Sequence, residues 1–502
     1  MKRFLALVLT VVFVATALAA FAAETTFKGQ YRVRAWNEYN FDKKLEDQNN
    51  FFPGHDNAQY DGWFDQRFRL TITHTRSEFL KAVIRFDIVE DTWGQQRNLR
   101  INNSAAGNFI NLAYIEFTLP QIGTFTVGKF NETYGYGLAF SDEGDGTIGL
   151  TGARWANAWG PVALSVLYAK VSDGISAGSN TAWYNWDADL YAMNLKITPA
   201  EKHVIELFGG ALIDSDAWGN IVGGSLWNSL AARWNSFGDA SAVIGFTGIA
   251  YTGNIADMID IAIENSYIFG HATRHVGPGL LNPTANYPIS YSINGWNVYA
   301  DVSYYNDLLR VGVAFIMGSG QHHWWNRPTY DNINMNYISA DKFTFNQIIV
   351  GNAGTNSIWR AGRGPFDDNN NIENITAVKL YFEICPVEKL TLNASITWAK
   401  WTEDVGKNLV GTRAAIVNAK GSAYPHPASW YGNYFYQSWD ADDDLGWELD
   451  FGFSYEIMEG LTYSLSAGVL FTGDSWDYEK ADGSRGDWGE IWSITNQLLY
   501  EF

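Results

Sequence analysis

A chain of 502 residues is long for one globular domain, yet its composition does not suit several soluble domains. Aromatic residues make up 16% and charged residues only 18%, whereas soluble domains carry roughly 25% charged residues. The formal charge of −20 argues against nucleic acid as a partner, because phosphate binding needs clustered Lys and Arg. A single cysteine, Cys385, excludes an intramolecular disulfide and a cysteine-rich metal site.

Residues 1–22 differ from the rest of the chain. Met1-Lys2-Arg3 is positively charged, residues 4–18 are apolar, and Ala20-Phe21-Ala22 provides the small residues of a cleavage site. We therefore expect residues 1–22 to be a cleaved secretory signal peptide and residues 23–502 to form the mature chain. The alternative is an N-terminal transmembrane anchor, since the apolar stretch is nearly long enough to cross a bilayer.

Strict alternation of apolar and polar residues dominates the remaining chain. Residues 445–457 place Leu, Trp, Phe, Tyr and Ile at every second position, with Gly, Glu, Asp and Ser between them. A period of two is typical of a strand with one apolar and one wet face. The segment is longer than the five or six residues usual in soluble sheets, and strands of about ten residues match a tilted bilayer crossing.

Eighteen segments of this kind follow one another. Those at Thr124, Val162, His203 and Ala242 alternate less cleanly, so sixteen is the alternative count. The segments begin near Phe27, Trp63, Phe79, Phe109, Thr124, Ile148, Val162, Asp189, His203, Ala242, Met258, Asn294, Leu308, Ile375, Leu390, Leu445, Leu461 and Trp488.

Short and long connections alternate between these segments. The short ones contain the Gly, Pro, Asn and charged residues of tight hairpin turns. This rhythm is typical of an all-β, antiparallel up-and-down barrel with short periplasmic turns and long extracellular loops. Amphipathic strands can cross hydrocarbon only as a closed ring, so we predict one transmembrane β-barrel domain over residues 23–502. The long connections cover residues 41–61, 92–108, 133–147, 172–188, 214–240, 271–293, 319–373, 402–443 and 473–487.

The last strand carries a family resemblance. Trp492, Ile494, Leu498, Tyr500 and Phe502 share one face. In this the sequence resembles bacterial outer-membrane porins, whose final strand ends in Phe after alternating apolar residues. The resemblance implies a multi-pass barrel in the bacterial outer membrane, contact with its lipid and lipopolysaccharide, and recognition of Phe502 by the barrel-assembly machinery.

A second resemblance covers the first third of the chain. The segments Asp65-Gln66-Arg67-Phe68-Arg69-Leu70, Ser77-Glu78-Phe79-Leu80-Lys81, Asp91-Thr92-Trp93-Gly94, Ala113-Tyr114-Ile115-Glu116-Phe117 and Val127-Gly128-Lys129 look like the opening hairpins of two channel groups. These groups are the homotrimeric porins and the eighteen-stranded alginate-export-type channels. Eighteen strands departs from the sixteen of the trimeric general porins, so a homotrimer stays open.

With the apolar face assigned to lipid, the other face points into the lumen. Strands one, two, three and six then supply a basic wall of Lys28, Arg32, Arg34, Arg67, Arg69, Lys81, Arg85 and Arg154. Later strands supply an acidic wall of Asp260, Glu264, Asp301, Glu383, Glu448 and Asp450. In a ring of eighteen, strand two lies opposite strand eleven, so the walls would create a transverse field, as in general porins. The alternative is that lumen positions merely alternate in sign to stay hydrated.

The connection 133–147 contains three carboxylates between glycines, Asp142, Glu143 and Asp145. It resembles the third loop of porins, which folds into the barrel and presents carboxylates at the constriction, facing the basic wall. The alternative is a solvated turn, with Ca²⁺ as a ligand. The connections 319–373 and 402–443 are further candidates for plugging the lumen.

We expect no cofactor and no metal in the lumen. Two acidic clusters in outer loops are candidates for structural Ca²⁺ or for a solvated rim that holds divalent ions near lipopolysaccharide. They are Asp367-Asp368-Asn369-Asn370 and Asp440 with Asp442, Asp443 and Asp444. Aromatic loop residues would either stack on sugar rings or build loop packing and an interfacial girdle. They are Trp183, Trp186, Trp324, Trp325, Trp430 and Tyr431.

Together these patterns predict a water-filled porin channel for passive diffusion of small hydrophilic solutes or ions. One alternative is a selective channel for an oligosaccharide or an anionic polysaccharide, of the alginate-export type. Another is a barrel sheath around an electron-transfer partner. We predict no enzymatic activity, because none of the eight His residues is paired with Ser or Asp at a recognisable spacing.

Overall fold

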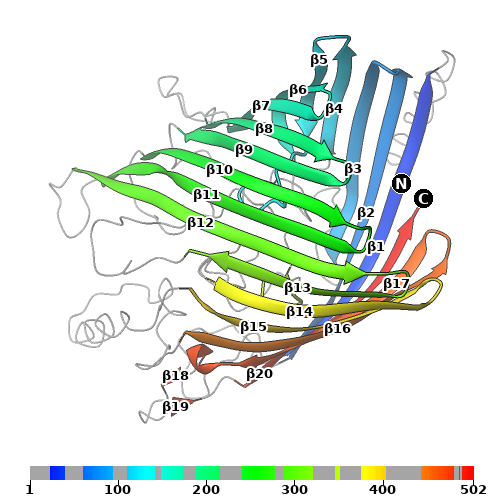
Figure 1. Cartoon of the computed structure of the whole chain (residues 1–502), viewed down its shortest axis with the longest axis vertical. Coiled ribbons are helices and arrows are strands. Elements are labelled where there is room, and N and C mark those ends of the chain that lie inside the picture. The colour runs from blue at the N-terminus through cyan, green and yellow to red at the C-terminus, as the bar shows by residue number, and fades with distance from the viewer. Residues whose placement is uncertain are drawn as a thin grey trace.

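Eighteen long antiparallel strands form a single sheet that closes on itself (Figure 1). The computed structural model describes residues 23–39, 60–93, 110–141, 149–172, 188–214, 240–276, 287–319, 345–350, 375–402, 443–476, 478–479, 485–486 and 489–502. Within these ranges no helix has the length and apolar character needed to cross a membrane. The predicted signal peptide, residues 1–22, lies outside them.

The first half of the ring comprises β1 (Glu24–Tyr39), β2 (Tyr60–Ser77), β3 (Leu80–Thr92), β4 (Ile110–Leu119), β5 (Gly123–Phe130), β6 (Leu150–Trp159), β7 (Val162–Ser172), β8 (Ala188–Ala200) and β9 (His203–Asp214). The second half comprises β10 (Ala240–Ile255), β11 (Ile259–Val276), β12 (Tyr287–Tyr305), β13 (Leu309–Gly318), β14 (Ile375–Val387), β15 (Leu390–Trp401), β16 (Asp444–Met458), β17 (Leu461–Thr472) and β20 (Glu490–Glu501). A short 3-10 helix, η2 (Asp474–Trp476), and the two-residue strands β18 (Tyr478–Glu479) and β19 (Arg485–Gly486) lie between β17 and β20.

The ring closes between the first and last strands. In Figure 1, β1 lies beside β20, and both pair antiparallel from Gln30 opposite Glu501 to Tyr39 opposite Trp492. The Gly29 amide donates to the carbonyl of Phe502 at 2.8 Å, and the Phe502 amide donates back to Gly29 at 3.1 Å. The seam therefore extends to the last residue of the chain.

The predicted all-β barrel and its count of eighteen strands are confirmed. Each alternating segment of the sequence corresponds to one long strand, and each long strand pairs with its chain neighbours. One boundary was wrong: the predicted loop 271–293 is largely strand, because β11 and β12 stay paired as far as Val276 opposite Tyr287. Backbone pairing can continue beyond the stretch where alternation marks a lipid-facing surface, which explains the error.

Large apolar side chains are exposed around the outside of the ring. Ile115 on β4, Val313 on β13 and Phe451 on β16 are each about half exposed. Each of the remaining long strands also carries exposed large apolar side chains. In an ordinary soluble protein so large an apolar surface would be covered. This face is therefore the one that suits hydrocarbon.

The buried residues lie inside the ring. One apolar cluster joins inward-facing residues of β7 to β11 with residues 130–140, and a second joins β13 to β17 and β20 with residues 345–350. Both clusters include residues from the connections between strands. The barrel interior is thus partly filled by segments of the chain itself.

Candidate functional site on the inner wall

The inner face of β1 to β4 carries a dense polar network. Arg34 forms an ion pair through Nε with Asp65, at 3.0 Å from both carboxylate oxygens, and the Trp36 indole donates to the same carboxylate at 2.5 Å. Arg69 forms a two-point pair with Asp87, at 2.6 and 2.8 Å. Two-point Arg–carboxylate pairs fix both partners in orientation.

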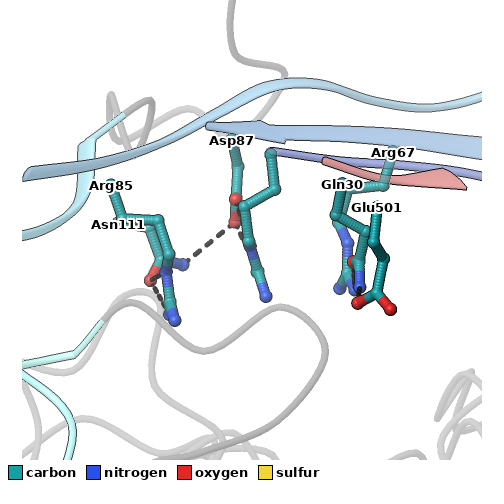
Figure 2. A network of polar contacts seen from close by, with 7 residues as sticks. Gln30, Arg67, Arg85, Asp87, Asn111 and Glu501 are labelled. Atoms are coloured by element: carbon teal, nitrogen blue, oxygen red, sulfur yellow. Dashed lines mark hydrogen bonds and ion pairs between the residues drawn. The ribbon is translucent and has the colours of Figure 1, made fainter. Parts of the chain in front are cut away.

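Neutral amides link these charges across the strands. Arg67 donates to the side chain of Gln30 at 2.7 Å, and Gln30 lies 3.4 Å from Glu501 across the seam. Arg85 donates to Asn111 at 2.9 Å, and Asn111 donates to Asp87 at 3.0 Å. Figure 2 shows these labelled side chains projecting from the same side of the sheet.

The predicted basic wall is a mixed wall. All eight predicted cations lie on β1, β2, β3 and β6, as expected, but carboxylates are placed among them. Besides the pairs above, Lys81 lies 2.7 Å from Glu116 and Arg154 lies 2.5 Å from Glu132, while Arg32 lies 4.0 Å from Asp65. Lys28 is exposed near the short-turn end of β1. This arrangement favours the alternative in which lumen positions alternate in charge sign to stay hydrated.

The predicted acidic wall likewise contains cations. Arg310 forms an ion pair with Asp260 at 2.8 Å and lies opposite Glu383 in the β13–β14 register. Asp301 accepts the Tyr381 hydroxyl at 2.8 Å, and Asp450 accepts the Ser395 hydroxyl at 2.9 Å. A simple opposition of one positive and one negative wall does not describe these side chains.

Glu264 and Glu448 require a correction. Both point inward, as predicted, but each is fully buried and so does not line open water. The reason is that each lies beneath a segment of the chain that folds into the barrel. Alternation along a strand identifies the inner face but carries no information about what covers it.

The first inserted segment comprises residues 133–141, which follow β5. Its ends are joined by a bridge between Thr133 and Ser141, whose hydroxyls lie 2.9 Å apart. At its tip the Tyr136 amide donates to Glu264 Oε2 at 2.5 Å, and the Gly135 amide donates to Glu206 at 3.3 Å. The segment therefore reaches β9 and β11 across the interior.

Apolar packing also holds this segment. Phe140 stacks on Phe246 of β10 with ring centroids 5.3 Å apart, and Tyr134 packs against Phe208 of β9 at 6.0 Å. Tyr134 and Phe140 are both almost completely buried. Burial raises the pKa of the Tyr134 hydroxyl above its usual range, so this side chain stays neutral.

The second inserted segment comprises residues 345–350. The Phe345 amide donates to the Val350 carbonyl at 2.8 Å, which closes it into a compact turn. Its backbone and side chains bond to four strands: Lys379 of β14, Thr397 of β15, Glu448 of β16, and Ser493 and Thr495 of β20. Ile348, Ile349 and Val350 are completely buried.

The sequence reasoning located one inserted segment and left the other open. The loop 133–147 was predicted to fold inward, and residues 133–141 do so; its carboxylates Asp142, Glu143 and Asp145 lie outside the described residues. Residues 345–350 fall within the loop 319–373, whose inward folding was an open alternative. The apolar run Ile348-Ile349-Val350 inside a polar loop was the signal that could have identified it.

Several other sequence-based sites cannot be placed. The Asp367 cluster, Asp440, Asp442 and the six aromatic loop residues considered for sugar stacking or for loop packing lie outside the described residues. Asp443, by contrast, forms an ion pair with Lys400 at 2.6 Å, and Asp444 accepts the Trp398 indole at 3.2 Å. Both carboxylates thus take part in contacts at the end of β15 and β16.

Two of the described histidines make structural contacts. His74 lies 2.9 Å from the Thr25 hydroxyl, and His203 lies 2.8 Å from the Tyr251 hydroxyl. Over the part of the chain that the structure describes, no group of three or more His, Cys, Asp and Glu side chains is arranged to hold a metal ion.

Comparison with known proteins gives distant structural likeness only. No protein-family model matches the chain, and no curated protein matches it. The outer membrane protein OpdK from Pseudomonas aeruginosa aligns over 95% of this chain and 98% of its own, with 10% identity and a TM-score of 0.47. OprD of the same organism aligns over 96% and 94%, with 10% identity and a TM-score of 0.46. OmpT of Vibrio cholerae aligns over 96% and 98%, with 10% identity and a TM-score of 0.38. Because these likenesses are so distant, the function is argued from the barrel itself.

Proposed function

We propose that this protein is a channel of the bacterial outer membrane through which small hydrophilic solutes or ions diffuse passively. The observation that carries the proposal is the closed ring of eighteen strands, which is apolar outside and carries ion pairs inside. In lipid every backbone polar group must be paired, and a ring paired from β1 to β20 meets that requirement.

The interior supports conduction rather than a solid core. Partly exposed charged groups such as Arg34, Lys81 and Arg310 lie on the inner wall, where they keep water ordered and favour polar solutes. The inserted segments 133–141 and 345–350 pack on other parts of the wall and reduce the free cross-section. A barrel with charged walls and inserted segments is a suitable filter for small solutes.

The partners follow from this placement. The apolar outer face would contact membrane lipid, and lipopolysaccharide would surround the loop end of the barrel. Phe502 at the seam is the residue we expect the barrel-assembly machinery to recognise. A homotrimer remains a prediction, which mass measurement by light scattering of the detergent-solubilised, folded protein would test.

Single-channel recording tests the proposed function. The folded barrel, added to one side of a planar lipid bilayer, should produce discrete current steps, whereas the same preparation unfolded by heat should not. Blocking by sugars and organic acids would then identify the solute class. Folded protein that inserts without current steps would contradict the proposal and favour a sheath around a partner.

A further inference from the structure

One wall glutamate lies beneath each of the two inserted segments. We propose that Glu448 and Glu264 are positioning residues that latch residues 345–350 and 133–141 into the lumen, and that their carboxylates set the width of the channel through those segments. The effect on channel width rests on the proposed function. The latching itself does not, because it concerns only how the segments are held.

The Glu448 carboxylate is held by donors from the second segment. Its Oε1 accepts the Ile348 amide at 2.7 Å, and its Oε2 accepts the Ile349 amide at 2.7 Å and the Asn346 side chain at 3.2 Å. Two consecutive backbone amides that face one carboxylate form an anion-binding concavity.

The Glu264 carboxylate has a similar role on the other segment. It accepts the Tyr136 amide at the tip of residues 133–141, and Gly135 beside it turns with φ of +57°. The neighbouring Glu206 accepts the Gly135 amide at 3.3 Å and is itself paired with Lys196 at 3.0 Å. A carboxylate on the wall therefore receives backbone amides from each inserted segment.

Burial makes these bonds decisive for the position of the segments. Glu448 and Glu264 are both completely buried while the segments are in place. Segment donors replace water at both oxygens of Glu448, whereas at Glu264 the Tyr136 amide replaces water at Oε2 and Oε1 has no partner. If a segment left the wall, its carboxylate would face the lumen and regain water. Glu448 thus has donors for both oxygens in either arrangement, and Glu264 has a donor for at least one oxygen, while apolar burial of residues such as Ile349 favours the inserted arrangement.

The two segments also share a buried apolar cluster. Leu138, from the first segment, belongs to the same buried cluster as Phe345, Ile348 and Ile349 of the second. The strand ladder does not depend on either contact, because the backbone pairs of β11 and β16 run to their own neighbours. Loss of a latch should therefore loosen the segments and leave the barrel folded.

Hydrogen exchange measured by mass spectrometry tests the latch directly. In Glu448→Gln the side-chain amide accepts one backbone donor but presents its own N–H groups to the other. Exchange in a peptide covering residues 345–350 should become about ten- to a hundred-fold faster, since a buried amide left without its acceptor shifts local opening by that order. Glu264 accepts through Oε2 alone, and a Gln could keep that bond, so the corresponding variant is Glu264→Leu, which removes the acceptor and should speed exchange in residues 133–141.

Glu456→Gln is the matched control. Glu456 lies on the same strand as Glu448 and its replacement removes the same charge, but it pairs with Lys389 at the short-turn end, at 3.6 Å. Exchange at residues 345–350 in this variant should equal that of the wild type. The heat-sensitive gel mobility of folded barrels checks that every variant is folded.

Single-channel recording of the same proteins separates the two proposals. Larger conductance with added open-channel noise in Glu448→Gln, together with faster exchange, would support both. Faster exchange in a barrel that gives no current, wild type included, would retain the latch and reject the channel. Unchanged exchange at residues 345–350 in folded Glu448→Gln would overturn the latch at Glu448, and unchanged exchange at residues 133–141 in folded Glu264→Leu would overturn it at Glu264, whatever the currents show.

Discussion

Gly135 lies where the first inserted segment approaches Glu264 on the barrel wall. Its φ is +57°, and a Cβ atom there would lie 2.5 Å from Glu264 Oε2. A left-handed conformation costs a residue with a side chain about 1 to 2 kcal/mol, and the contact with Glu264 adds to that. A glycine is therefore required at this tip both for its backbone and for its lack of a side chain.

We predict that Gly135→Ala partly releases residues 133–141. Hydrogen exchange in that segment should accelerate, and the channel conductance should rise. The control is Gly160→Ala, because Gly160 has a nearly identical φ of +60° but a Cβ there would contact nothing within 4 Å. If both variants behaved alike at residues 133–141, the close approach to Glu264 would have no role.

The charged residues of β2 allow a test of ion selectivity. Replacing both Arg67 and Arg69 by Glu makes the inner wall more negative and leaves the Asp87 carboxylate without the cation that it pairs with. The reversal potential in a salt gradient should shift toward cation preference, most clearly at low ionic strength. Replacing Lys202 and Lys389, on the short turns, by Glu changes the total charge equally and should shift the potential less. An unchanged potential in the β2 variant would remove these arginines from the conducting path.

At the level of the strands, position and register could be predicted from the sequence because lipid imposes a regular pattern of apolar residues. Every lipid-facing position of a strand such as β16 must be apolar, so Trp447, Leu449 and Phe451 reveal its register directly. No such rule acts on the interior. The position of residues 345–350 inside the barrel depends on contacts between parts of the chain about 100 residues apart, such as the one between Ile348 and Glu448. The alternation of apolar and polar residues does not predict such contacts.

The seam between β1 and β20 gives a prediction for Phe502. Its ring lies over Gly29, where a Cβ atom would be 2.0 Å from ring carbon Cζ, and it stacks with Tyr500 at 5.5 Å and Phe68 at 6.5 Å. Each aromatic pair contributes about 0.5 to 1.5 kcal/mol beyond its buried area.

Phe502→Ala should therefore reduce the amount of folded barrel in outer-membrane fractions. Phe471→Ala is the control, because Phe471 is exposed to a similar degree on the outer face of β17 but lies away from the last residue. Heat-sensitive gel mobility of membrane fractions measures the folded share. Equal folded amounts in the two variants would rule out a special role for the terminal ring.

Across the whole molecule, different arcs of the inner wall make different kinds of contact. Residues 133–141 pack on the arc from β7 to β11, and residues 345–350 pack on β13 to β16 and β20. The charged network of Arg34, Asp65, Arg69 and Asp87 occupies β1 to β3. The sequence predicted charged walls but not this division, because two of the six predicted acidic-wall residues, Glu264 and Glu448, are bonded to the inserted segments.

The single cysteine gives the molecule a built-in marker of its direction. Cys385 is free and exposed, and it lies three residues before the short turn at residues 388–389. A maleimide attached to a polymer too large to enter the pore should leave intact cells unlabelled and react once the outer membrane is permeabilised. Cys385→Ser should remain unlabelled in both cases. Labelling of intact cells would mean that the short turns face the external medium. The single thiol therefore reports which end of the barrel lies on the outer side of the membrane.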